Sequence, residues 1–152
     1  MLIQRLRVSG LLSFGLRGID LPLTSLNVLI GPNGSGKSNL LEILALLRAA
    51  PTKLASPMMT MGGVREWLWK GPGSRREGLV EVTVGGPEAG PLIQHNLVIT
   101  EHGGRFVVVD EQIGKRQPQD ALEGIKIEYF FQRGNPMLFD VDAQIRHLRP
   151  ES

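Results

Sequence analysis

An eight-residue glycine-rich segment constrains this chain more than any other part of its sequence. The segment is Gly31-Pro32-Asn33-Gly34-Ser35-Gly36-Lys37-Ser38, and it matches the pattern G-x-x-x-x-G-K-[ST]. It follows the apolar run 26–30, which is typical of a buried central strand. The leucine-rich residues after it contain no glycine or proline before Pro51. We therefore predict a helix over 36–48 that is buried on most sides and is ended by Pro51.

The residue types in this loop are suited to binding phosphate. Glycines permit positive φ, so successive amide N–H groups turn into one concavity, and a helix that starts near Gly36 adds unpaired N–H groups and the positive end of its dipole. The Lys37 ammonium reaches β- and γ-phosphate oxygens, while the Ser38 hydroxyl coordinates Mg²⁺. The eight residues and the following Asn39 thus predict a site for ATP with Mg²⁺, in which Lys37 also serves catalysis. The alternative is an ordinary glycine-rich turn before a helix, which does not need the lysine–serine pair.

Composition excludes several other kinds of site. The chain has no cysteine, which excludes disulfides, thiol catalysis and cysteine-ligated metal centres. Its three histidines are scattered and lack metal-ligand spacing. A net charge of +2 and a pI near 9.3 permit nucleic-acid binding without arguing for it. No apolar run reaches about 18 residues and no signal-peptide block begins the chain, so we expect a cytoplasmic protein without membrane contact.

Several segments have the composition and periodicity of strands. We predict strands at 2–8, 16–23, 78–84, 92–100, 105–113 and 125–132, and one or two helical turns at 64–69. Only a bend at 11–15 separates the first two strands, so they have no room for a crossover helix and should pair antiparallel. The expected fold is one domain over 1–152, of α/β class with α+β character. It is a P-loop nucleotide fold with a largely antiparallel or mixed sheet around the P-loop helix.

The residues around the loop carry a family resemblance. The run 26–42, LNVLIGPNGSGKSNLLE, resembles the ABC-class ATPases of the RecF/SMC group and is especially similar to their AAA_21 and overcoming-lysogenization-defect relatives. The upstream run 6–14, LRVSGLLSF, looks like the opening strand and loop of those proteins. The resemblance covers about the first third of the chain. It implies the amino-terminal lobe of an ABC-type ATPase head.

The resemblance also implies further residues and partners. In that group ATP is held between two heads, one giving the P-loop and Walker B carboxylates and the other a signature Ser-Gly motif. By position, Ser13 and Phe14 would lie near the nucleotide, and Arg65 would correspond to an arginine near nucleotide or DNA; a surface arginine is the alternative for Arg65. No signature follows the P-loop, so we expect the carboxy-terminal lobe with the signature and Walker B to be absent. The implied partner is that missing lobe or a second head in an ATP-dependent dimer, with DNA as a compatible ligand.

One later segment has the composition of a Walker B strand. Residues 106–109 are apolar and precede Asp110 and Glu111, which in that role would order Mg²⁺ and polarise the attacking water. A tight turn at 101–104 joins the segment to the strand before it, so it also fits one half of a β-hairpin. Gln132, at the end of the predicted strand 125–132, is either a Q-loop glutamine or an ordinary strand-end residue.

Three functions fit these observations, in the order given. The first is an ATP-driven head domain for DNA repair, chromosome maintenance or phage defence, with this chain binding nucleotide and hydrolysing little alone. The second is a self-contained P-loop NTPase or phosphotransferase that uses Asp110 and Glu111, which requires residues 105–109 to lie beside Val28 in the central sheet. The third is a nonenzymatic interaction module with an idle loop and no nucleotide affinity.

Overall fold

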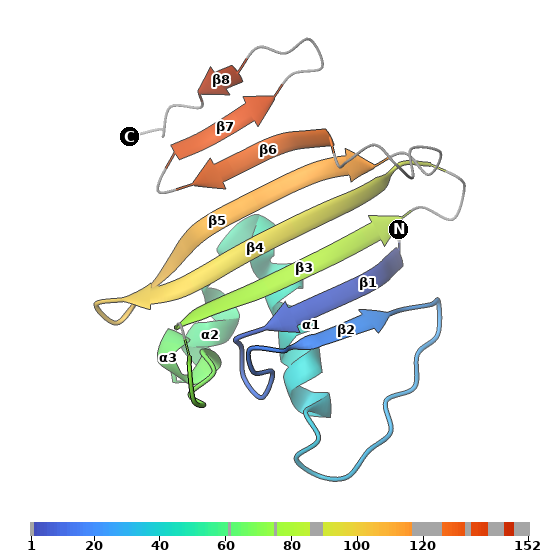
Figure 1. Cartoon of the computed structure of the whole chain (residues 1–152), viewed down its shortest axis with the longest axis vertical. Coiled ribbons are helices and arrows are strands. Elements are labelled where there is room, and N and C mark those ends of the chain that lie inside the picture. Colours follow the sequence, from blue (N-terminus) through green and yellow to red (C-terminus); the bar gives the residue numbers. More distant parts are fainter. Residues whose placement is uncertain are drawn as a thin grey trace.

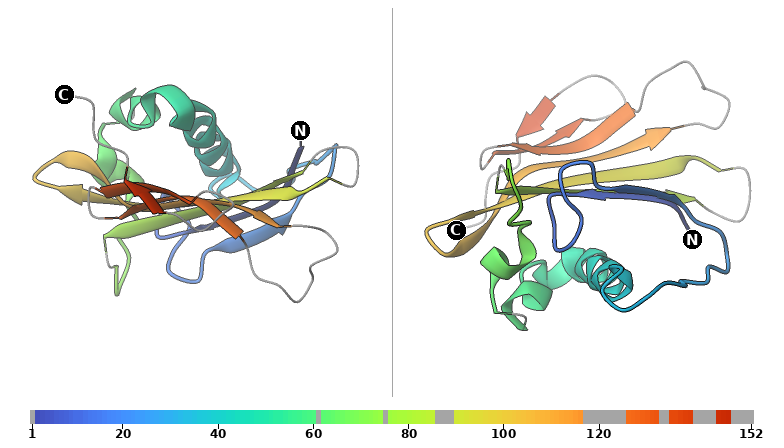
Figure 2. Two further views of the ribbon diagram at one scale, coloured as in Figure 1. Left: turned by 90° about the horizontal axis from the view of Figure 1, so that it is seen from above. Right: turned by 60° about the horizontal axis from the view of Figure 1, so that its bottom comes forward.

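One antiparallel sheet with helices on one face forms the described part of the chain (Figures 1 and 2). The computed structural model describes residues 2–60, 62–74, 76–85, 90–116, 126–132, 135–139 and 145–147. The elements in chain order are β1 (Leu2–Ser9), β2 (Ile19–Pro22), α1 (Lys37–Lys53), α2 (Ser56–Thr60), α3 (Val64–Trp67), β3 (Glu77–Gly85), β4 (Leu92–His102), β5 (Arg105–Arg116), β6 (Lys126–Gln132), β7 (Asn135–Phe139) and β8 (Ile145–His147). Their order in the sheet is β2-β1-β3-β4-β5-β6-β7-β8.

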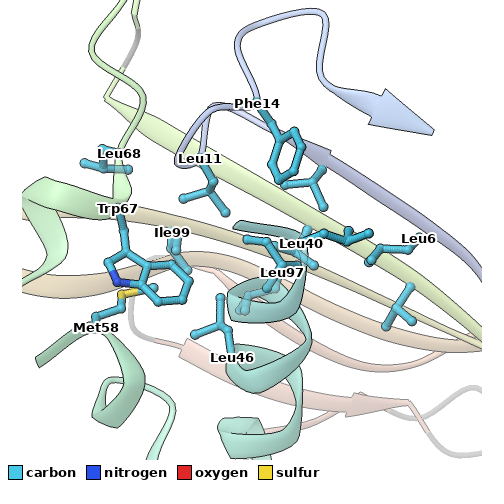
Figure 3. Close-up of a cluster of buried hydrophobic side chains, with 14 of the residues drawn as sticks. Leu6, Leu11, Phe14, Leu40, Leu46, Met58, Trp67, Leu68, Leu97 and Ile99 are labelled. Atoms are coloured by element: carbon cyan, nitrogen blue, oxygen red, sulfur yellow. The ribbon is translucent and has the colours of Figure 1, made fainter. Parts of the chain in front are cut away.

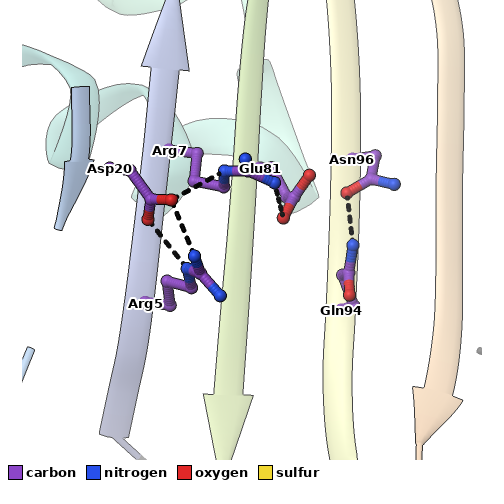
Figure 4. Close-up of polar contacts among 6 residues, drawn as sticks. All are labelled: Arg5, Arg7, Asp20, Glu81, Gln94 and Asn96. Carbon is purple, nitrogen blue, oxygen red and sulfur yellow. Dashed lines mark hydrogen bonds and ion pairs between the residues drawn. The ribbon is translucent and has the colours of Figure 1, made fainter. Parts of the chain in front are cut away.

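The alternating pattern of the strands separates an apolar face from a charged one. On β1, Leu6 and Val8 are buried, while Arg5 and Arg7 point to the other face. Arg5 binds Asp20 of β2 through two hydrogen bonds of 2.7 Å, and the Nε atom of Arg7 lies 3.1 Å from the same carboxylate (Figure 4). Each of these exposed ion pairs contributes little to the free energy of unfolding. They lie on the face of the sheet opposite the helices.

The core lies between the sheet and the helices (Figure 3). Helix α1 contributes one face to it, through Leu40, Ile43 and Leu46. Trp67 at the end of α3 is fully buried and packs close to Met58 of α2. The remaining members come from the strands, from the bend after β1, and from the start of α3 and the residue after it: Leu6, Val8, Leu11, Phe14, Val64, Leu68, Val80, Val82, Leu97 and Ile99. This core holds the amino-terminal half of α1 against the sheet.

The predicted strands and the hairpin are largely confirmed. β1 and β2 pair antiparallel, as the short connection requires, although β2 is shorter than the predicted 16–23. The strands β3, β4, β5 and β6 occupy the predicted segments. His102 lies opposite Arg105, and the two residues between them, Gly103 and Gly104, both have positive φ, of 60° and 81°. A two-residue turn of this kind suits glycine, which explains the position of the hairpin.

The predicted central strand over 26–30 is wrong for the described structure. These residues belong to no strand, and Leu26, Val28 and Ile30 are 79%, 74% and 90% exposed. In Figure 1 they lie in the open loop between β2 and α1. The Asn27 side chain instead binds Thr24, accepting from its amide at 3.0 Å and donating to its carbonyl at 2.8 Å. An apolar run becomes a buried strand only where neighbouring strands pair with it, and no described strand does.

Three further expectations need correction. Helix α1 continues past Pro51 to Lys53, because a proline near the carboxyl end of a helix removes only one of the few remaining backbone hydrogen bonds. The helix is buried on one face only, with Leu41 59% exposed, because the described elements cover just that face. The α/β class gives way to α+β, since the described strands pair antiparallel throughout. Within the described residues, no helix combines the length and apolar character needed to cross a membrane.

Candidate phosphate-binding site

The loop 31–36 is a series of turns that ends where α1 begins at Lys37. Gly34 and Gly36 have φ of 81° and 94°, in the left-handed region that side chains disfavour. At Gly31 an added Cβ atom would lie 2.8 Å from the Ser35 Oγ atom, so the Ser35 side chain would have to move. The backbone path of the loop thus favours glycine at Gly34 and Gly36. The loop is curled and exposed rather than extended.

The Lys37 ammonium closes this loop on itself. Its Nζ atom donates to the carbonyl oxygens of Gly31 at 2.7 Å and Pro32 at 2.8 Å, and lies 3.3 Å from the Ser35 Oγ atom. A single cation therefore gathers both ends of the loop around itself. Because the ammonium lies inside the curl, an anion that enters the loop meets a positive charge that is already in place.

The bend after β1 supports the loop from the side. A Cβ atom at Gly36 would lie 3.0 Å from the Ser13 Oγ atom and 3.4 Å from the Phe14 ring. Phe14 is itself 8% exposed and belongs to the core. The bend is fixed by paired backbone hydrogen bonds between Leu11 and Phe14, of 3.1 and 2.7 Å. Ser13 and Phe14 thus lie beside the predicted phosphate loop, and their nearness to a bound nucleotide stays a prediction.

The donors present fit a triphosphate with Mg²⁺. Helix α1 has no side-chain cap at Gly36 and no acidic residue in its first turn, so its first amides face no competing anion from these positions. Open space surrounds Gly34, where an added Cβ would meet no atom within 4 Å. Ser38 is exposed, and its hydroxyl would coordinate the metal ion. The bound metal ion would in turn neutralise phosphate charge. Asn39 lies in the first turn of the helix beside them.

Arg65 lies on α3 and makes an ion pair with the β4–β5 hairpin. Its Nη2 atom is 3.3 Å from the Glu101 Oε1 atom, and its side chain is 70% exposed. The Glu101 carboxylate also accepts the Gly104 N–H. The contact observed for Arg65 is thus structural, and its correspondence to a nucleotide- or DNA-binding arginine remains a prediction.

Acid is expected to weaken the anchoring of this hairpin. The Gly104 N–H and then Arg65 lower the pKa of Glu101 below its ordinary value of 4.5. A lowered folded-state pKa means that the stabilisation is complete above pH 4.5 and is lost as the pH falls through the folded-state value. Glu101→Gln should therefore lower the urea midpoint of unfolding at pH 7. The difference in midpoint between this variant and the unaltered chain should become smaller below pH 4.5. Glu77→Gln, at the start of β3, is the control, and a difference for Glu101→Gln that stays constant with pH would contradict the assignment.

The candidate Walker B residues lie in a hairpin strand. Asp110 and Glu111 are on β5, which pairs antiparallel with β4 and β6. The Glu111 Oε1 atom is 2.7 Å from the His95 Nε2 atom on the neighbouring strand. Residues 105–108 pair with β4, and residues 105–109 do not lie beside Val28, so the described residues do not have the arrangement that a self-contained enzyme requires. Gln132 ends β6 opposite Asp110, outside the loop 31–38.

Two features of the site were not foreseen from the sequence. The first is that Lys37 binds the carbonyls of its own loop, which depends on the loop path and has no sequence signal. The second is an open groove beside Ser13 and Asn39 that also involves Trp69 and Lys70. Its only local signal is the spacing of Glu66 and Lys70, which form an ion pair of 2.7 Å. Among the described residues, no group of three or more histidine, aspartate or glutamate side chains is arranged to hold a metal ion.

Comparison with known proteins agrees with the chemistry of the loop. Residues 26–82 match the family described as "AAA domain, putative AbiEii toxin, Type IV TA system". The matched range covers the run 26–30, the loop, the three helices and most of β3. No curated protein matches the chain. Residues 26–82 are therefore similar to an ATP-binding P-loop domain of AAA type, a class whose general activity is nucleotide hydrolysis.

Proposed function

We propose that this chain is the ATP- and Mg²⁺-binding half of an ABC-type ATPase head of the RecF/SMC-like group, acting in the cytoplasm. The observation that carries the proposal is the curled loop 31–36 around the Lys37 ammonium at the uncapped start of α1. Backbone amides, one ammonium and one hydroxyl are the donors that a triphosphate with Mg²⁺ needs. The similarity of residues 26–82 to an AAA-type domain supports the same class.

A completing lobe is part of this proposal. Leu26, Val28 and Ile30 are more than two-thirds exposed, and Leu41 on the outer side of α1 is 59% exposed. Apolar side chains in a continuous run at the base of a P-loop are costly to leave in water, at about 25 cal/mol per Å² of exposed apolar surface. A second lobe or a second head that pairs with residues 26–30 would bury them. It would also fix the loop that follows.

The proposal assigns hydrolysis to that completing part. Asp110 and Glu111 belong to a hairpin strand, and the Glu111 carboxylate is already in contact with His95. Within the described part of the chain, the loop therefore has phosphate-binding groups but no nearby carboxylate assigned to activate water. A role in DNA repair, chromosome maintenance or phage defence follows from the family resemblance alone.

The chain is expected to bind Mg-ATP and to turn it over negligibly. Equilibrium dialysis with Mg-ATP measures the binding, and phosphate release under the same conditions measures turnover. Binding without sustained phosphate release agrees with the proposal. Sustained turnover that is lost in Lys37→Ala would contradict the assignment of hydrolysis to a second lobe. Asp110→Asn and Glu111→Gln would then identify the residues responsible.

A further inference from the structure

An open groove of about 480 Å³ lies between Asn39, the residue that follows the phosphate loop, and the end of α3. This volume lies within the range of small-molecule sites. The residues that form it come from the bend after β1, the first turn of α1 and the segment after α3: Leu12, Ser13, Asn39, Leu68, Trp69 and Lys70. Ser13 also lies against Gly36 of the loop, so the groove and the loop are continuous.

The Trp69 ring is held in place beside this groove. It lies against the bare backbone of two glycines, since a Cβ atom at Gly15 would be 3.1 Å from its Cε2 atom and one at Gly71 would be 2.0 Å from its Cζ2 atom. Its own backbone is fixed as well, because its amide donates to the Gly10 carbonyl at 2.9 Å and its carbonyl accepts the Ser74 hydroxyl at 2.6 Å. The result is a positioned aromatic surface that is only partly covered.

The order of groups along the loop sets the direction of a bound ligand. Lys37 is suited to β- and γ-phosphate oxygens, and Ser38 to the metal ion. Asn39 is the next residue of α1, and it lines the groove. A triphosphate held in this order would have its α-phosphate end toward Asn39 and the groove, with its nucleoside beyond it.

We propose that this groove binds the nucleoside end of the triphosphate, with the base stacked on Trp69. The inference rests on the proposed function, because it assumes that the phosphates lie in the loop 31–38. Aromatic stacking suits any base, since every base has a π-face. Lys70 and Glu66, paired at 2.7 Å on the rim, supply donors and an acceptor for the base edge or the ribose.

A second hollow, which shares Leu68, Trp69 and Lys70 with the groove, is a poorer choice. It has a volume of about 510 Å³ and contains Arg65, Arg76 and Glu101, but neither Ser13 nor Asn39 lines it. Its lining residues therefore include none of those that connect the groove to the phosphate loop. The Arg65 guanidinium is also paired with Glu101 there.

Tryptophan emission distinguishes this groove from the phosphate loop. The chain has two tryptophans, so Trp67→Phe leaves Trp69 as the only one. In that variant, Mg-ATP should change the Trp69 emission and protect it from iodide quenching, whereas Mg-tripolyphosphate should bind without either effect. Trp69→Ala is expected to weaken ATP binding by about tenfold and to leave tripolyphosphate binding unchanged, while Trp69→Phe retains most of the ATP affinity. Circular dichroism checks that each variant is folded.

The outcomes separate the inference from the function on which it rests. Equal affinity for ATP and tripolyphosphate, with no ATP-specific change in Trp69 emission, would leave the phosphate site in place and overturn the nucleoside groove. An emission change of the same size with both ligands would also overturn it, because loop closure alone would then move the ring. If neither ligand binds, the phosphate site fails and the inference fails with it.

Discussion

Lys37→Ala is expected to reduce Mg-ATP binding by roughly tenfold or more. The ammonium is the only side-chain cation that the structure places inside the described loop 31–36. A hydrogen bond to a charged group contributes about 1.5–3 kcal/mol, and each 1.4 kcal/mol is a factor of about ten in affinity. The variant also loses the contacts to the Gly31 and Pro32 carbonyls, so the empty loop is no longer held in its curl. Isothermal titration calorimetry with Mg-ATP measures the effect.

Arg48→Ala is the matched control for this prediction. Arg48 is an exposed residue on the same helix, in its carboxyl half, so the variant loses one positive charge away from the loop. It should bind Mg-ATP as the unaltered chain does, because exposed charges separated by more than a Debye length are largely screened at physiological salt. Equal losses of Mg-ATP affinity in the two variants would mean that binding depends on the net charge of the chain and not on the loop.

Trp67→Ala is expected to lower the free energy of unfolding by about 3–5 kcal/mol. Trp67 is fully buried where α2, α3 and the sheet meet, and it is the largest fully buried side chain described. A domain of this size is usually stable by only about 5–15 kcal/mol, so the loss would leave a large unfolded fraction in mild urea. Because α1 packs in the same core, the start of α1, which follows the phosphate loop, should lose its ordered structure when the core unfolds. Urea unfolding followed by circular dichroism tests the prediction.

Trp67→Phe separates ring packing from hydrogen bonding at this position. The Trp67 Nε1 atom is buried and has no hydrogen-bond partner among the described residues, which is a cost that phenylalanine does not carry. Removing the N–H offsets part of the lost volume, so we expect a stability change below about 1.5 kcal/mol. A loss as large as that of Trp67→Ala would contradict this expectation, because the full volume of the indole, and not an aromatic ring alone, would then be needed in the core.

Patterns confined to one segment predicted much of the described sheet correctly. Alternation of apolar and charged residues located β1, because Leu6 and Val8 face the core while Arg5 and Arg7 face outward. Gly103 and Gly104 located the hairpin, because a two-residue turn needs positive φ at both positions. The β1–β3 and β3–β4 pairs and the strand order beyond β5 were not predicted, because only the β1–β2 pair and the β4–β5 hairpin follow from short connections.

The run 26–30 was mispredicted because burial depends on what surrounds a segment. Its composition is that of a central strand, but composition does not provide the neighbouring strands that would pair with it. The phosphate loop was found because its chemistry requires particular residues at fixed spacing. The groove at Trp69 was not found, since it joins residues from three separate segments that have no common sequence pattern. The phosphate site was therefore predictable from one local motif, whereas the residues around it are brought together only by the fold.

Amide chemical shifts test the central claim most directly. Mg-ATP is titrated into the ¹⁵N-labelled chain, and the backbone N–H signals of Gly34, Gly36 and Ser38 are followed by NMR. Phosphates bound in the loop should shift these three signals most and leave those of the β4–β5 hairpin, such as Gly103, nearly unchanged. Saturable shifts confined to residues outside 31–39, or no shifts at millimolar Mg-ATP, would contradict a phosphate site in this loop.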